Sequence, residues 1–298
     1  MKQKFIEHRF STKNLEKLEQ VQQIVGEYQN QGLSLTLRQL YYQMVSRDFI
    51  PNSQNEYKKI ADLLSDARRA GLIDWDAIED RTRSLSGYEH YESPSDAVIQ
   101  AARGYGIDLL ADQDVYLECW VEKDALKDLV GRACGRYDVN YFSCRGFASD
   151  SEVYKAGRRL RYMIEMGKTV TILHLGDHDP SGIDMSRDIL ERLELFGEIP
   201  NKIDFRRIAL NMDQIRTFNP PPNPAKDKDT RYQSYVEKYG PTSWELDALE
   251  PSVFMNLITT EIEEIIDLDR FKARVNLESE QREQLIETAK RLTEEMRI

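Results

Sequence analysis

Cysteine and histidine are scarce in this sequence, and their scarcity excludes several classes of site. The 298 residues include three cysteines and four histidines. The cysteines, at positions 119, 134 and 144, show no C-x-x-C spacing, so neither a disulfide framework nor a cysteine-rich zinc site is indicated. Reduced thiols are typical of the cytosol, and we therefore expect a cytoplasmic protein.

Long apolar segments are also missing. No run approaches the ~18–20 apolar residues that a membrane span requires, so no membrane association is expected. The N-terminal sequence Met1-Lys2-Gln3-Lys4-Phe5 has no apolar core of the kind found in secretory signals. The pattern G-x-x-x-x-G-K-[S/T] is absent as well, so no phosphate-binding loop for ATP is recognisable.

The charge is negative and unevenly distributed. The net charge is −11, which by itself disfavours binding to nucleic acid. Residues 1–91 carry 13 basic and 13 acidic residues, so the whole acidic excess lies in the remainder of the chain. A nucleic-acid-binding N-terminal part is therefore permitted. The length is sufficient for two domains.

The N-terminal third has a helical pattern. Apolar residues at helical spacing predict helices over residues 14–31, 36–49 and 55–70, followed by an extended piece at 72–75 and by Arg81 and Arg83. Three short helices and a wing are the outline of a winged helix-turn-helix domain, which we place at residues 1–91. Basic residues off the apolar stripe of the third helix are candidates for DNA contacts, although an ordinary solvated face explains them equally well: Lys58, Lys59 and Arg69.

The pattern changes after a polar linker at residues 92–112, which contains a short helical stretch. Between residues 113 and 212 the sequence predicts strands at 115–121, 139–144, 169–175 and 203–210, separated by helices at 125–137, 151–166 and 183–196. This alternation predicts an α/β domain with a parallel sheet and helices on both faces. Residues 213–298 follow, with a proline-rich loop at 218–231 and a helical C-terminal part whose last helix is expected at 277–297.

An acidic motif follows the third strand of this domain. Asp177-His178-Asp179-Pro180-Ser181-Gly182 comes directly after the apolar run Val170–Leu175, where α/β proteins place their sites. Glu122 ends the first strand, and neighbouring strands would bring the three carboxylates to one sheet edge. Three carboxylates without histidine suit Mg²⁺ or Mn²⁺ rather than zinc. The alternative is that these carboxylates are satisfied by helix N-termini.

Glu122 after a first strand and Asp-x-Asp-x-x-Gly after a later one resemble a Toprim domain, the Rossmann-like domain shared by topoisomerases, some primases and several nucleases. The Asp-His-Asp-Pro-Ser-Gly form is similar to the A subunit of type IIB topoisomerase (topoisomerase VI) and its meiotic break-making relatives, in a reduced, stand-alone form. The resemblance implies that Glu122, Asp177 and Asp179 hold Mg²⁺ and that Glu122 takes part in proton transfer.

Those relatives carry a catalytic tyrosine in an Arg-x-x-Tyr-Tyr segment of a winged helix, and Arg38-Gln39-Leu40-Tyr41-Tyr42 matches it. The spacing of Leu37, Leu40, Tyr41 and Met44 predicts that Tyr41 lies in the core. Tyr42 is four residues after Arg38, on another face of the helix. Spacing alone favours a tyrosine that packs and makes one hydrogen bond, and it is the resemblance that implies Tyr42 as the nucleophile. We expect the Arg38 guanidinium to stabilise its phenolate, lowering the Tyr42 pKa, and to bind the scissile phosphate.

Three functions are consistent with these motifs. The first is DNA cleavage by tyrosine transesterification, in which the resemblance implies a homodimer on double-stranded DNA, with the tyrosine of one subunit beside the metal of the other. A separate ATPase partner is then possible. The second is a Toprim nuclease that uses metal-activated water. The third is a non-catalytic DNA-binding regulator. Arg145, in a turn after the second strand, is a weaker candidate for a phosphate contact.

Overall fold

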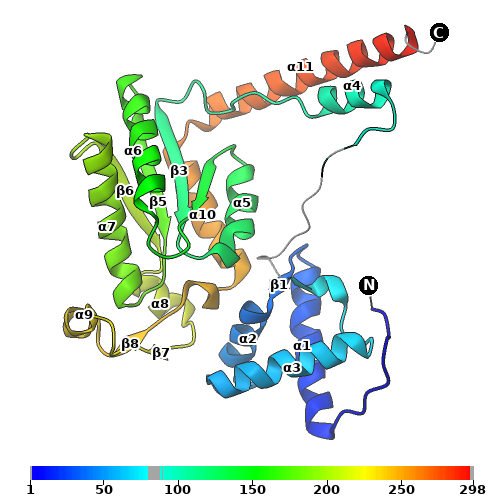
Figure 1. Cartoon of the computed structure of the whole chain (residues 1–298), viewed down its shortest axis with the longest axis vertical. Coiled ribbons are helices and arrows are strands. Elements are labelled where there is room, and N and C mark those ends of the chain that lie inside the picture. Colours follow the sequence, from blue (N-terminus) through cyan, green and yellow to red (C-terminus); the bar gives the residue numbers. More distant parts are fainter. Residues whose placement is uncertain (1, 80–87, 89, 296–298) are drawn as a thin grey trace.

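The computed structural model describes residues 2–79, 88 and 90–295, and its N-terminal part is helical (Figure 1). The helices are α1 (Thr12–Gln29), α2 (Leu37–Ser46) and α3 (Gln54–Arg69), and each begins after a side-chain cap. Ser11 and Ser53 accept hydrogen bonds from backbone N–H groups of α1 and α3, and Thr36 forms a capping box with Gln39. Their apolar faces form one core, so the three expected helices are confirmed.

The expected wing differs from the structure. Residues 72–73 form a bend that leads into the short 3₁₀ helix η1 (Trp75–Ala77), and the strand β2 (Ile78–Glu79) comes later. It pairs in parallel with β1 (Leu35–Thr36). Arg81 and Arg83 lie outside the described residues. The winged helix therefore stays a prediction. We call residues 2–79 the N-terminal helical unit.

The central part is an α/β domain with a four-stranded parallel sheet, as the sequence predicts. Its strands are β3 (Val115–Val121), β4 (Asn140–Ser143), β5 (Thr169–Leu175) and β6 (Ile203–Ala209), in the order β4-β3-β5-β6. One face packs against α5 (Lys127–Gly135) and α10 (Pro251–Ile265), and the other against α6 (Asp150–Glu165) and α7 (Pro180–Gly197) (Figure 1). A short 3₁₀ helix, η2 (Asp124–Leu126), connects β3 to α5.

The C-terminal part returns to the sheet before it extends away from it. Helix α8 (Met212–Phe218), which the sequence analysis does not anticipate, precedes the antiparallel pair β7 (Asn223–Pro224) and β8 (Thr242–Ser243), with α9 (Tyr232–Tyr239) between the two strands. The 3₁₀ helix η3 (Leu246–Ala248) then leads into α10. The last helix, α11 (Leu268–Glu295), begins nine residues before the expected start.

Helix α11 forms an arm together with α4 (Pro94–Arg103), which lies in the expected linker (Figure 1). The Tyr105 hydroxyl donates to Gln281, and the Ile107 N–H donates to Glu278. The helical stretch expected near residues 95–103 is thus present, and it is bound to the C-terminal helix. Among the described helices, none is both long enough and apolar enough to span a bilayer.

Candidate functional site

The acidic motif lies at the carboxyl-terminal edge of the sheet. Glu122 directly follows β3, and Asp177 follows β5, its neighbour in the sheet. The Asp177 N–H donates to Glu122 Oε2 at 2.9 Å. Asp179 is the N-cap of α7, and its Oδ1 accepts from the Gly182 N–H at 2.7 Å. Parallel neighbours therefore bring the Glu122 carboxylate into contact with the Asp177 backbone, and the helix start fixes Asp179. The three carboxylates predicted to share an ion do not form a group with ligand oxygens within 4.8 Å of one another among the described residues.

The turn between Asp177 and α7 is closely packed. A β-carbon at Gly182 would lie 2.3 Å from the Asp177 carbonyl oxygen and 3.1 Å from Glu122 Oε2. The buried guanidinium of Arg207, on β6, donates to the carbonyl oxygens of Asp177 at 2.6 Å and Gly182 at 2.9 Å. The sequence analysis does not identify Arg207, because a single arginine in a strand carries no motif.

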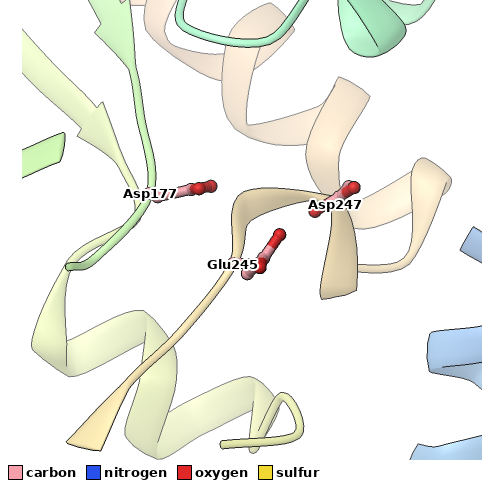
Figure 2. Close-up of side chains that lie close together, drawn as sticks. All are labelled: Asp177, Glu245 and Asp247. Atoms are coloured by element: carbon pink, nitrogen blue, oxygen red, sulfur yellow. The ribbon is translucent and has the colours of Figure 1, made fainter. Parts of the chain in front are cut away.

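Two further carboxylates reach Asp177 from the C-terminal part. Asp177, Glu245 and Asp247 each offer an oxygen within 4.8 Å of the others, and this group could hold a metal ion (Figure 2). The Leu246 N–H donates to Asp177 Oδ1 at 2.8 Å, which fixes the segment against the motif. The sequence analysis does not predict this group. Its signal is a second pair of carboxylates two residues apart, Glu245 and Asp247, which is separated from the short strand β8 by one residue. We call these three residues with Glu122 and Asp179 the acidic centre.

The ammonium of Lys123 lies among the three grouped carboxylates. Its Nζ is 2.9 Å from Asp177 Oδ1, 2.6 Å from Glu245 Oε2 and 2.8 Å from Asp247 Oδ1. Burial works to lower the pKa of Lys123, but the surrounding carboxylates hold it well above its usual value. The three grouped carboxylates are oxygen ligands of the kind that Mg²⁺ and Mn²⁺ prefer. The ammonium of Lys123 contacts all three of them.

The charges of the acidic centre are unevenly compensated. Burial opposes ionisation of Asp247, yet Lys123 and Arg38 lower its pKa. For Asp177 burial dominates and raises the pKa to about 7. Burial also raises the pKa of Glu122, and the charge of Asp179 adds to this rise. In the described part of the chain, Asp179 meets one basic side chain within ion-pair distance, the exposed Lys226 at 3.8 Å.

Tyr41 is a structural residue, as its position on the apolar stripe of α2 predicts. Its side chain is buried, and its hydroxyl lies 3.0 Å from both Asn52 Oδ1 and the Ser53 carbonyl oxygen. The same hydroxyl accepts from the Ser53 N–H at 2.7 Å. These contacts use its hydrogen-bonding capacity and fix the start of α3.

Tyr42 is also buried, but its hydroxyl is less engaged. Asn223 Nδ2 lies 3.5 Å from it. Burial, with the charges of Glu245 and Asp247, raises the pKa of Tyr42 to about 12. The expected net lowering of the Tyr42 pKa is therefore wrong, although the charge of Arg38 does act to lower it. The guanidinium is directed to two carboxylates, with Nη2 3.5 Å from Glu245 and Nε 3.6 Å from Asp247, and its effect on the phenol is the smaller one.

One cavity connects the tyrosine to the acidic motif. It has a volume of about 580 Å³ and lies between the N-terminal helical unit and the segments around α7 and β7–β8. We call it the tyrosine cavity. Its wall includes Arg38, Tyr42, Asp179, Asn223, Lys226 and Glu245. The predicted nucleophile and one predicted metal ligand thus line the same cavity of a single chain.

The basic residues predicted to contact DNA do not line this cavity. Lys58 and Arg69 are exposed on α3, and Lys59 forms an ion pair with Glu56 at 2.7 Å. Arg145 is exposed, has a φ of 55° and pairs with Asp124 at 3.1 Å. The structure therefore places these side chains at the surface, and of their elements only the Arg145–Gly146 turn adjoins the acidic centre, through a bond of 3.1 Å from the Gly146 N–H to the Glu122 carbonyl oxygen.

Comparisons of the chain with protein-family models, with curated proteins and with solved structures find no match. The resemblance to Toprim proteins thus rests on the motifs themselves and on their arrangement.

Proposed function

We propose that this protein breaks DNA strands in a Mg²⁺-dependent transesterification with Tyr42 as the nucleophile, as in type IIB topoisomerase A subunits. The tyrosine cavity carries the proposal. Tyr42 and Arg38 come from α2, Asp179 comes from the start of α7, and all three line the same cavity. A tyrosine and an acidic centre at a parallel sheet edge are the two parts that this chemistry needs.

The reaction exchanges one ester bond for another. The Tyr42 oxygen attacks the phosphorus, the bond from phosphorus to the 3′ oxygen breaks, and a 5′-phosphotyrosyl link forms. The phenolic proton leaves to a base, for which Glu245 is positioned because it lines the cavity and is the carboxylate that most raises the Tyr42 pKa. The leaving 3′ oxygen takes up a proton, so no oxidant or reductant is consumed.

The chain offers Glu122, Asp177 and Asp179 to a divalent ion. These are hard oxygen donors, and burial makes a bound cation favourable beside Glu122 and Asp177, whose pKa values are raised. A bound Mg²⁺ would supply positive charge for the phosphate oxygens. Arg38 would hold the phosphate through its guanidinium once it leaves Glu245 and Asp247.

A cavity of about 580 Å³ has the size of a small-molecule site, so it accommodates a nucleotide-sized fragment rather than a duplex. DNA breakage therefore requires the N-terminal helical unit to separate from the C-terminal segment. The contacts to be broken include the Arg38 ion pairs, the bonds from Asn52 Nδ2 to Pro222 and Asn223, the contact from Asn223 to Tyr42, and the packing of Ala248 and Met255 against the N-terminal core.

The test compares Tyr42→Phe with Tyr41→Phe as a matched control. The wild-type chain is incubated with plasmid DNA and Mg²⁺, denatured and scored for DNA attached to protein. We expect adducts from wild type and from Tyr41→Phe, and none from Tyr42→Phe. Tyr41→Phe loses stability by about 1–3 kcal/mol, because buried partners remain unpaired. Cleavage by Tyr42→Phe at the wild-type level would refute the proposal.

A metal-dependent nuclease is the second candidate, and the raised pKa of Tyr42 favours it. A phenol with a pKa of about 12 is a poor nucleophile near neutral pH in the arrangement described. In this case Tyr42→Phe cuts DNA without an adduct. Asp177→Asn then separates either enzyme from a non-catalytic DNA-binding regulator. Either enzyme should lose DNA cleavage in this variant, whereas a regulator does not cleave DNA in wild type and should retain DNA binding in the variant.

A further inference from the structure

Lys123 has no role in the proposed reaction, yet it is the most tightly held cation of the acidic centre. An ammonium has three N–H donors. The Nζ of Lys123 has three carboxylate partners, Asp177, Glu245 and Asp247, at 2.6–2.9 Å. The side chain extends from the end of β3, directly after Glu122, into the space between β5 and the C-terminal segment.

This ammonium lies where a divalent ion would lie. The three oxygens that it contacts belong to the group that could hold a metal ion. An ion bound to the same oxygens would be about 2.0–2.6 Å from each of them. The Lys123 nitrogen is 2.6–2.9 Å from them, so the two cations would occupy the same position and cannot be bound together.

The distribution of basic side chains around the acidic centre supports the same conclusion. Arg38 also meets Glu245 and Asp247, so this side of the acidic centre has two basic side chains for three carboxylates. On the other side, Glu122 accepts a backbone N–H and Asp179 caps α7, and both receive weaker cationic contacts. A divalent ion is therefore bound more favourably beside Glu122 and Asp179, whose charges are less compensated by basic side chains.

We propose that Lys123 is a built-in cation in the position of a second metal ion, so that the acidic centre binds one divalent ion and not two. The single ion at Glu122, Asp177 and Asp179 rests on the proposed function. The exclusion of an ion from Asp177, Glu245 and Asp247 rests on Lys123 alone. Removing its charge should open a second site for a metal ion.

The experiment counts Mn²⁺ bound to the full chain, by the loss of the electron paramagnetic resonance signal of free Mn²⁺. Wild type is compared with Lys123→Met and with Lys123→Arg, which keeps the charge. We expect Lys123→Met to bind one Mn²⁺ more than wild type and Lys123→Arg to bind the same number. Equal numbers for all three proteins, or two ions in wild type, would overturn the proposal.

The outcome also separates this inference from the proposed function. If wild type binds no Mn²⁺ and Lys123→Met binds one, Lys123 has the inferred role and the metal site of the proposed function is wrong. Thermal unfolding of Lys123→Met and of Lys123→Gln provides a second readout. Mn²⁺ should raise their melting temperatures more than that of wild type, because a ligand that binds the native state stabilises it. Equal shifts in all proteins would contradict the proposal, as would a Lys123→Met chain that folds neither with nor without Mn²⁺.

Discussion

Replacing Gly182 by alanine should destabilise the protein because the new methyl group has no space. The β-carbon would lie 2.3 Å from the Asp177 carbonyl oxygen, and real β-carbons do not approach closer than 3.0 Å. The obstacle is backbone that Arg207 also holds, through a bond of 2.6 Å to the same oxygen. It cannot rotate away as a flexible side chain would.

The magnitude follows from two opposing effects. Overpacking of a close-packed site costs about 1–3 kcal/mol, and a backbone obstacle places Gly182 at the upper end. Alanine in the first turn of α7 recovers up to about 1 kcal/mol of helix propensity. We therefore expect the free energy of unfolding to fall by about 2 kcal/mol.

Urea unfolding of Gly182→Ala measures this loss, and Gly26→Ala is the matched control. Gly26 lies within α1, and a β-carbon there meets nothing within 4 Å. The control should therefore gain up to about 1 kcal/mol, because alanine favours the helix. If Gly182→Ala were as stable as wild type, the close approach of α7 to Asp177 would not exist in the folded protein. The geometry assigned to the acidic motif would then be wrong.

Three further predictions concern pH, DNA binding and the arrangement of the subunits. Burial lowers the pKa of His174 to about 3, below the unfolded value of 6.5. The contribution of neutral His174 to the free energy of unfolding is therefore complete above pH 6.5 and is lost as the pH falls. By about pH 4.5 this residue should have cost the folded protein about 3 kcal/mol of stability. If urea unfolding of His174→Gln showed the same pH dependence as that of wild type, this prediction would be contradicted. Lys58→Ala should lower the salt dependence of DNA binding by about 0.9 in log–log slope, and Lys59→Ala by less because of its ion pair, both measured by fluorescence anisotropy. A mixture of Tyr42→Phe and Asp177→Asn chains should form no DNA adducts if the cavity of one chain is the active unit. Adducts from the mixture would instead indicate that the tyrosine of one subunit acts with the acidic centre of another.

The strands and their parallel arrangement were predictable because the signals are local. The run Val170–Leu175 is apolar and lies between Gly167 and the acidic motif, and β5 has the expected bounds of Thr169–Leu175. Alternation with helices then requires parallel neighbours. Helix α8 has a local signal too, in the capping box of Asn211 and Gln214, but its seven residues are too few to produce a convincing apolar period.

The acidic centre was predictable in one half only. Glu122 and Asp177 follow neighbouring strands, so sheet topology brings them together. Glu245 and Asp247 reach Asp177 because residues 243–247 cross the carboxyl edge of the sheet, where His178 and Trp244 pair through their backbones. No periodicity in the sequence specifies such a contact between distant segments. The same limitation contributes to the wrong expectation for the Tyr42 pKa, which is raised first by burial and then by the charges of these same two carboxylates.

The uneven compensation of the acidic centre is the strongest physical reason to regard it as functional. Buried carboxylates cost several kcal/mol unless they are paired, and the fold provides Lys123 and Arg38 for Asp247. It provides less for Glu122, whose pKa stays raised by burial although Arg207 is near. A core selected for stability alone would replace such a group by an apolar one. Glu122 is nevertheless retained beside Asp177, at the edge of the sheet that leads to the tyrosine cavity. This is consistent with a cation that binds beside Glu122 when the protein functions.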